Sequence, residues 1–149
     1  MSKAIKKISD SVNSELIERT KELNCLYQVE ELFNQSHLSF EEIMNKLIQV
    51  VPRGFKFKDK IIVRITFLGR IFQPMGFVES KISINSDIKS FDEYFGKIEI
   101  FYLKNDIVNY NLIFSPEEIR LMNNIADRLG HYAIYQKVRG LFQELKILN

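Results

Sequence analysis

Apolar residues recur at helical spacing through the first third of the chain. No proline or glycine interrupts residues 5–34, so the pattern predicts one long amphipathic helix. From Leu16 onward the series follows a seven-residue repeat, which is typical of a helix that packs against a second helix. A domain of this size covers only part of such a helix, so its first turns are expected to meet another chain or to fray in water. The apolar positions are Ile5, Ile8, Val12, Leu16, Leu23, Leu26 and Phe33.

A second, shorter helix is predicted after residue 39. Ser39 and Glu42 have the spacing of a capping box, in which each side chain satisfies a free backbone donor of the other residue. Pro52 disfavours helical geometry in the residue before it, so this helix is expected to end at Val51. One face of the helix carries Phe40, Ile43, Leu47 and Val51.

The pattern then changes to that of β-strands. Residues 61–67 are dense in β-branched and aromatic side chains, and a hairpin partner is predicted to begin at Ile71. Two further alternating runs cover residues 81–88 and 94–103, with a turn between them at 91–93. Alternation in the last run indicates an antiparallel sheet with one covered face. Ile98, Ile100 and Tyr102 share one face of that run, and Lys97, Glu99 and Phe101 share the other.

A polar stretch at 104–113, expected to be a loop, leads to a strongly marked helix start. Ser115 and Glu118 have capping-box spacing, and Pro116 suits the first helical position. The apolar series of this helix changes register after Tyr132, and its later steps of four and three resemble a coiled-coil seam, so the helix end is expected to leave the domain body. The two series are Leu121, Ile125, Leu129 and Tyr132, and then Ile134, Val138, Leu141, Leu145 and Leu148.

Composition is that of a single reduced domain. A chain of 149 residues with 46% hydrophobic residues can bury a core without disulfides or metals. Cys25 is the one cysteine, and residues 1–9 lack the apolar run of a signal peptide or membrane anchor, so we expect a cytoplasmic protein without membrane contact. The net charge of +2, from 21 basic and 19 acidic residues, is not the one-sided charge of a nucleic-acid-binding domain.

Residues that carry enzyme chemistry are scarce. The sequence shows no pairing of a nucleophile with a base and no phosphate-binding glycine loop. His37 and His131 have no further ligand at metal-binding spacing, and Cys25 fits a core position of a helix. The acidic pairs at 41–42 and 117–118 belong to first helical turns, where the helix dipole favours them. We therefore assign no catalytic residue, metal or cofactor and do not expect an enzyme.

Three side chains of the predicted sheet are candidate ligand contacts. Arg64 is a charge in an otherwise apolar strand, so its guanidinium must reach water, a carboxylate or a bound anion. Phe72 and Tyr102 would add bulk and a polar tip to the same site. Residues 53–60 interleave basic and aromatic side chains, a pattern that can bind single-stranded nucleic acid. The alternative for residues 53–60 is a solvated loop whose aromatic side chains fold back onto the core.

Several segments resemble a known family of sensor domains. They are 21–27, 43–52, 64–65, 96–102 and 114–130, and together they span most of residues 19–138. In order and spacing they resemble the divergent GAF-type domains that stand at the N-terminus of phosphoenolpyruvate/pyruvate-binding phosphotransferase proteins and beside sensor histidine kinases. The resemblance implies an α+β fold with a central antiparallel sheet backed by terminal helices. It also implies a regulatory role with a phosphotransferase or kinase partner. The signature of cyclic-nucleotide-binding GAF domains and a chromophore-attachment cysteine are both absent.

Taken together, these features predict one α+β domain with a body at 19–138 and helical extensions at 1–18 and 139–149. We expect a parallel homodimer formed through the first and last helices. The candidate functions are sensing of a small molecule near the sheet, structural dimerisation without a ligand, and, third, nucleic-acid binding through residues 53–60. The expected dimer contacts are Leu16, Leu23, Leu26, Val138, Leu141 and Leu145.

Overall fold

The computed structural model describes residues 2–103 and 113–148. Its described residues form three α-helices, one short 3₁₀ helix and a four-stranded antiparallel sheet, which confirms the α+β class. The predicted loop at 104–113 lies, apart from Ile113, outside the described residues. In chain order the elements are α1 (Ser2–Phe33), α2 (Phe40–Val50), η1 (Val51–Gly54), β1 (Ile61–Phe67), β2 (Arg70–Phe72), β3 (Ser83–Ser90), β4 (Glu93–Tyr102) and α3 (Pro116–Leu148).

The sheet has the strand order β2-β1-β4-β3, and every neighbouring pair is antiparallel. Its inner face is apolar and buried, as the alternation predicts, with Ile65 opposite Ile98 at its centre. The same alternation predicts an open outer face, but Phe101 on that face is only 4% exposed. Phe77, in the segment between β2 and β3, packs on its ring with 5.3 Å between the centroids. Part of the second face is therefore covered as well.

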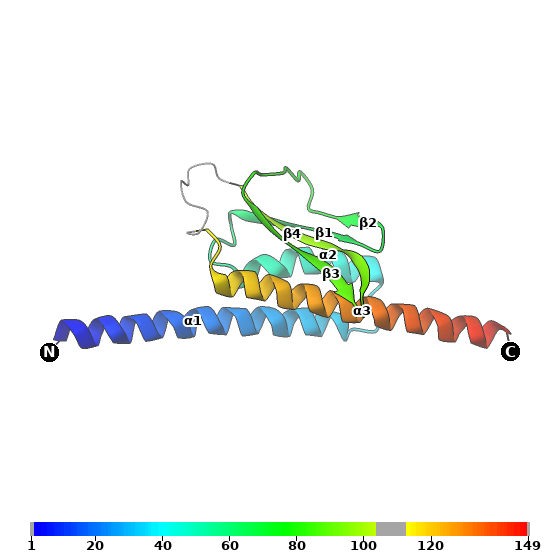
Figure 1. The fold of residues 1–149 in the computed structure, drawn as a ribbon, viewed down its shortest axis with the longest axis horizontal. Helices are drawn as coiled ribbons and strands as arrows, with labels where there is room; N and C mark the ends of the chain where they lie inside the picture. Colours follow the sequence, from blue (N-terminus) through cyan, green and yellow to red (C-terminus); the bar gives the residue numbers. More distant parts are fainter. Residues whose placement is uncertain (1, 104–112, 149) are drawn as a thin grey trace.

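The helices back the inner face in two layers (Figure 1). α2 packs against β1 and β2, and α3 packs against β3 and β4. α1 lies beneath them, against α2, α3 and η1. α3 approaches the β3 backbone closely because Gly130 has no side chain: a Cβ there would lie 2.6 Å from the carbonyl oxygen of Lys89. The backbone of β3 therefore leaves no room for a side chain at residue 130.

α1 and α3 run in the same direction and overlap only in part (Figure 1). Beyond the overlap each continues as a single helix, and the two ends leave the body on opposite sides. We call residues 2–17, all of them exposed, the N-terminal overhang and residues 135–148 the C-terminal overhang. Three contacts join the overlapping parts in the same order along both helices. They are Glu22 with Arg120, Glu30 with Arg128, and Phe33 with Tyr132.

Both predicted helix starts are present. At α3 the Ser115 backbone N–H donates to the Glu118 carboxylate at 3.0 Å, and the Glu118 N–H donates to the Ser115 hydroxyl at 3.2 Å, which is a complete capping box. At α2 only half of the box forms. The Glu42 N–H donates to the Ser39 hydroxyl, whereas the Glu42 carboxylate accepts from that hydroxyl at 3.1 Å instead of from the backbone. One hydroxyl thus serves both interactions at the start of α2.

Both hairpins turn through two residues with positive φ, which is the geometry of a type I′ turn. Leu68 (φ 52°) and Gly69 (φ 80°) join β1 to β2, and Phe91 (φ 51°) and Asp92 (φ 64°) join β3 to β4. Phe91 is 86% exposed, so packing does not compensate for its left-handed backbone. This turn is therefore a site of local strain.

We predict that Phe91→Asn combined with Asp92→Gly raises the free energy of unfolding by about 1 kcal/mol, because both new residues tolerate this turn better. Urea denaturation followed by circular dichroism measures the change. Met75→Asn, at a fully exposed position of the segment between β2 and β3, is the matched control and should change stability by less than about 0.5 kcal/mol. A destabilised double variant would contradict the turn geometry.

Candidate functional site

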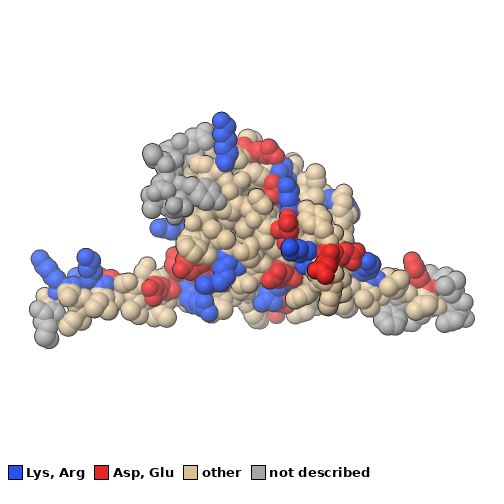
Figure 2. Space-filling model, in the orientation of Figure 1, with Lys and Arg blue, Asp and Glu red and all other residues tan. Residues whose placement is uncertain are grey.

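The most unusual surface feature is a series of apolar side chains along both long helices. About half or more of each side chain is exposed, although the core between sheet and helices is filled. Figure 2 shows charged side chains of both signs gathered where α1 and α3 overlap. We call these side chains the α1 stripe and the α3 stripe. The α1 stripe is Ile5, Ile8, Val12, Leu16 and Leu23, and the α3 stripe is Val138, Leu141 and Leu145.

The two stripes do not belong to the faces that hold the core together. On α1 the buried side chains, which include Cys25 and Val29, lie on a different side of the helix from the stripe. On α3 the apolar series is buried as far as Ala133 and becomes exposed from Val138. The register change predicted after Tyr132 therefore coincides with the point where α3 leaves the body. Within the body, the solvent side of α3 is polar: Arg120, Asn123, Asp127 and His131 are exposed.

Of the six predicted dimer contacts, five are exposed on the stripes: Leu16, Leu23, Val138, Leu141 and Leu145. The sixth, Leu26, is half-buried and packs against the core. Leu26 falls where α1 is already covered by the rest of the domain. It is therefore only partly open to a second chain.

The three predicted ligand contacts do not come together. Arg64 and Glu99 are opposite one another on the outer face of the sheet, whereas Phe72 and Tyr102 are buried on the inner face. Strand alternation explains the separation. Tyr102 pairs with Ile61, which is three residues before Arg64 on β1, so the side chains of residues 102 and 64 point to opposite faces of the sheet. A single pocket built from Arg64, Phe72 and Tyr102 is thus not formed.

Arg64 is held by an internal charge cluster. Its Nε and Nη2 donate to the two carboxylate oxygens of Glu99 at 2.9 and 3.0 Å, and Nη2 also lies 2.9 Å from Glu79. The rings of Phe77 and Phe101 lie 4.9 and 5.2 Å from its guanidinium carbon. Hydrogen bonding to Glu99 raises the pKa of Arg64, so the group stays charged. Two carboxylates already balance this charge, which leaves the structural ion pair as its role.

Tyr102 and Phe72 are core side chains. Tyr102 is fully buried against Phe57, and among the described residues its hydroxyl has no hydrogen-bond partner. Phe72 packs edge-on against Phe40 with 5.6 Å between the ring centroids. Neither residue lines any of three cavities at the surface of the described residues.

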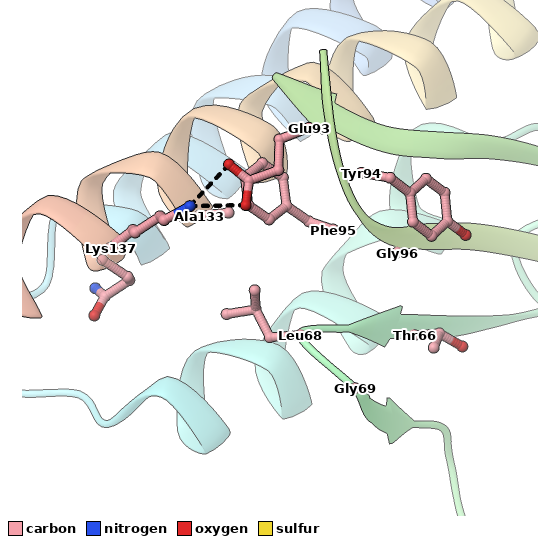
Figure 3. A pocket seen from close by; sticks show the side chains of 10 residues that line it. Thr66, Leu68, Gly69, Glu93, Tyr94, Phe95, Gly96, Ala133 and Lys137 are labelled. Atoms are coloured by element: carbon pink, nitrogen blue, oxygen red, sulfur yellow. Dashed lines mark hydrogen bonds and ion pairs between the residues drawn. The ribbon is translucent and has the colours of Figure 1, made fainter. Parts of the chain in front are cut away.

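The first cavity, of about 670 Å³, lies at the end of the sheet (Figure 3). We call it the sheet-end cavity. Leu68 of the first hairpin turn, Tyr94 of β4 and Ala133 of α3 give it a mostly apolar lining. At its rim the Lys137 ammonium donates to both carboxylate oxygens of Glu93 at 2.8 and 3.0 Å. This pair ties the first residue of β4 to α3.

Two other cavities lie between α1 and α3. One, of about 670 Å³, is at the start of α3 and is lined by mixed charges that include Glu18, Arg19 and Lys56. The other, of about 600 Å³, is where α1 ends and α3 continues, and we call it the α1–α3 cavity. Burial raises the pKa of Tyr132 in its wall, while the charge of Arg139 acts in the opposite direction.

The remaining candidates from the sequence are structural. Cys25 is buried, its Sγ lies 3.7 Å from the Val51 carbonyl oxygen, and burial raises the pKa of the thiol to about 11. Phe55 is buried and Phe57 packs against the core, so the aromatic rings of loop 53–60 are not available for stacking on bases. The described residues contain no group of three or more His, Cys, Asp or Glu that could hold a metal ion. Nor is any helix in the described ranges long and apolar enough to cross a membrane.

Comparison with known proteins does not indicate which of these features has a function. Searches against family models, curated proteins and solved structures find no significant match. The exposed stripes and the α1–α3 cavity are therefore the features from which a function has to be inferred.

We predict that Arg64→Leu lowers the free energy of unfolding by about 2 kcal/mol, because the Glu99 side chain, only 12% exposed, loses its main partner. Arg64→Leu with Glu99→Leu should recover part of the loss, since no unpaired charge remains. Urea denaturation of the single and double variants measures both effects. Arg70→Leu is the control: its ion pair with Glu41 is more than half exposed and should contribute less than about 1 kcal/mol. A double variant no more stable than Arg64→Leu would contradict the coupling between Arg64 and Glu99.

A second prediction concerns Cys25. Its folded pKa of about 11 exceeds the unfolded value of 9.0, so its contribution to stability is present below pH 9 and is lost as the pH rises to 11. Between these values the unfolding free energy of the wild type should fall by on the order of 2 kcal/mol more than that of Cys25→Ala. Urea titrations at several pH values supply the comparison. Parallel pH profiles for the two proteins would exclude a buried, protonated thiol.

Proposed function

We propose that this chain is a non-catalytic regulatory domain that works as a parallel homodimer, with α1 and α3 of the two copies forming a common helical spine. The observation that carries the proposal is the pair of exposed apolar stripes on a domain whose core is otherwise complete. Soluble monomers rarely expose contiguous apolar patches of this kind, and such patches mark interaction sites.

A second copy is the occupant that fits these stripes. The chain itself has no helix to cover either overhang within the described ranges, and the two overhangs leave the body on opposite sides. A two-fold axis along the helices brings each stripe against its own counterpart, so one set of residues serves both chains. The spacing of Leu16 with Leu23 and of Val138, Leu141 and Leu145 is that of a coiled-coil seam.

The energy of such a contact is sufficient. Covering a Leu- or Ile-sized side chain contributes on the order of 1 kcal/mol when about half of it is already buried. Eight stripe residues in each copy then offset an association cost of roughly 4–15 kcal/mol. A dimer that forms at micromolar concentration is therefore expected.

The regulatory role is supported by the resemblance of residues 19–138 to GAF-type sensor domains and by the helix-backed sheet. That resemblance also suggests a phosphotransferase or kinase as the downstream partner and a cytoplasmic location. A small ligand near the sheet would have to use the sheet-end cavity, because the inner face is filled by core side chains such as Ile65 and Ile98. Structural dimerisation without a ligand is the alternative, and the filled inner face favours it over a ligand held between sheet and helices.

Light scattering coupled to gel filtration tests the assembly. At about 50 µM we expect twice the chain mass of 17.6 kDa. Leu16→Asp and Leu141→Asp should each weaken the dimer at least tenfold, because a carboxylate would be buried in the helix contact. Val78→Asp is the matched control, since Val78 is similarly exposed but belongs to the segment between β2 and β3 and to neither long helix. A wild-type monomer at this concentration would refute the dimer.

Disulfide trapping tests the orientation. Leu16→Cys and Leu141→Cys should each cross-link to the same residue of the second copy, and Val78→Cys should not. The native Cys25 is buried and does not interfere. A mixed disulfide between residues 16 and 141 would instead indicate an antiparallel or head-to-tail contact.

A further inference from the structure

The α1–α3 cavity has the position and lining of a ligand site. It lies where α1 ends and turns towards α2 while α3 continues past it. Its volume of about 600 Å³ falls in the range of pockets that hold small molecules, which is roughly 300–1,000 Å³. One wall is the face of α3 that carries residues 128–139, and the other is the end of α1 with Asn34, Gln35 and Ser36.

Basic side chains outnumber acidic ones in the lining of this cavity. Two arginines and a histidine of α3 line it, Arg128, His131 and Arg139, against one lining carboxylate, Glu30. Arg128 uses Nη1 to pair with Glu30, while its Nε is buried and has no hydrogen-bond partner among the described residues. Arg139 forms no hydrogen bond or ion pair with any described side chain. The cavity lining therefore has two guanidinium groups and one carboxylate.

A buried guanidinium donor without a partner costs free energy that a bound acceptor would recover. Guanidinium groups recognise phosphate and carboxylate through two parallel hydrogen bonds, and the charge strengthens both. The amide and hydroxyl groups of Asn34, Gln35 and Ser36 on the opposite wall can supply further donors. The stacked rings of Phe33 and Tyr132, 4.8 Å apart, give the same cavity an apolar side.

We propose that the α1–α3 cavity binds a small metabolite through an oxyanion group, with Arg128 and Arg139 as its principal contacts. The shared chemistry is a phosphate or carboxylate attached to a small body that fits against the aromatic side of the cavity. The site shares Gln136 with the sheet-end cavity, and none of its lining residues belongs to either apolar stripe, so a single copy of the chain presents the whole lining. It lies at the point where α3 leaves the body, which places a bound anion next to the base of the C-terminal overhang.

Isothermal titration calorimetry at about 50 mM salt tests the proposal with pyrophosphate and citrate as separate probes. At least one of them should bind, and Arg139→Gln should weaken that binding at least tenfold. Arg128→Gln should do the same, but it also breaks the pair with Glu30, so its melting temperature is measured alongside. Arg53→Gln is the matched control, because Arg53 is an exposed arginine that hydrogen-bonds Gln28 outside the cavity.

The outcomes separate the sources of the anion. Binding of pyrophosphate alone identifies a phosphate ligand, binding of citrate alone identifies a carboxylate ligand, and binding of both identifies an oxyanion site of broad specificity. Each supports the proposal if Arg139→Gln weakens it and Arg53→Gln does not. No binding of either probe, or equal binding to Arg139→Gln, overturns it. Binding retained in Leu141→Asp would show that the anion site stands whether or not the chain dimerises.

Discussion

The partial overlap of two parallel helices is the constraint on which the rest of this structure depends. Glu22 with Arg120 and Glu30 with Arg128 hold α1 and α3 in one register. Phe33 stacks on Tyr132 at the end of the overlap. Because the overlap is shorter than either helix, each helix has an unpaired length, and the two lengths emerge at opposite ends. The overhangs, the apolar stripes and the α1–α3 cavity all result from this one offset.

The offset also explains why α3 changes its apolar face. In the body, Leu121, Ile125 and Leu129 pack into the core, and Gly130 lets the β3 backbone lie against the helix. Past Ala133, Ile134 still packs against the core and Lys137 still pairs with Glu93 of β4, but the apolar side chains at 138, 141 and 145 are exposed. The apolar positions thus change to a different side of the helix, where Val138 and Leu141 are exposed. One helix thus packs into the core along its first half and exposes apolar side chains along its second.

The surroundings of two arginines distinguish a structural charge from one that a ligand could contact. Arg64 is neutralised by Glu99 and Glu79 and enclosed by two aromatic rings, so it stabilises the outer face of the sheet. Arg139 is not neutralised in this way and lines a cavity. A charge satisfied by several fixed partners would have to give up those hydrogen bonds to bind a ligand, whereas a charge without protein partners gives up only its hydration. Arg139 on α3 is therefore a better candidate for a ligand contact than Arg64 on β1.

Local rules determined much of this fold from the sequence alone. Capping residues predicted the starts of α2 and α3, and β-branched alternation predicted the bounds of β1 and β4 within one residue. The change of apolar register marked the place where α3 leaves the body. Each of these features depends on residues that are only a few positions apart. Tertiary structure alone decided which partners Arg64 has, that Phe77 covers Phe101, and that Arg128 and Arg139 share a cavity with the end of α1. Those contacts join residues tens of positions apart, and the offset between α1 and α3 that creates the cavity comes from packing both helices on one sheet, which no local pattern encodes.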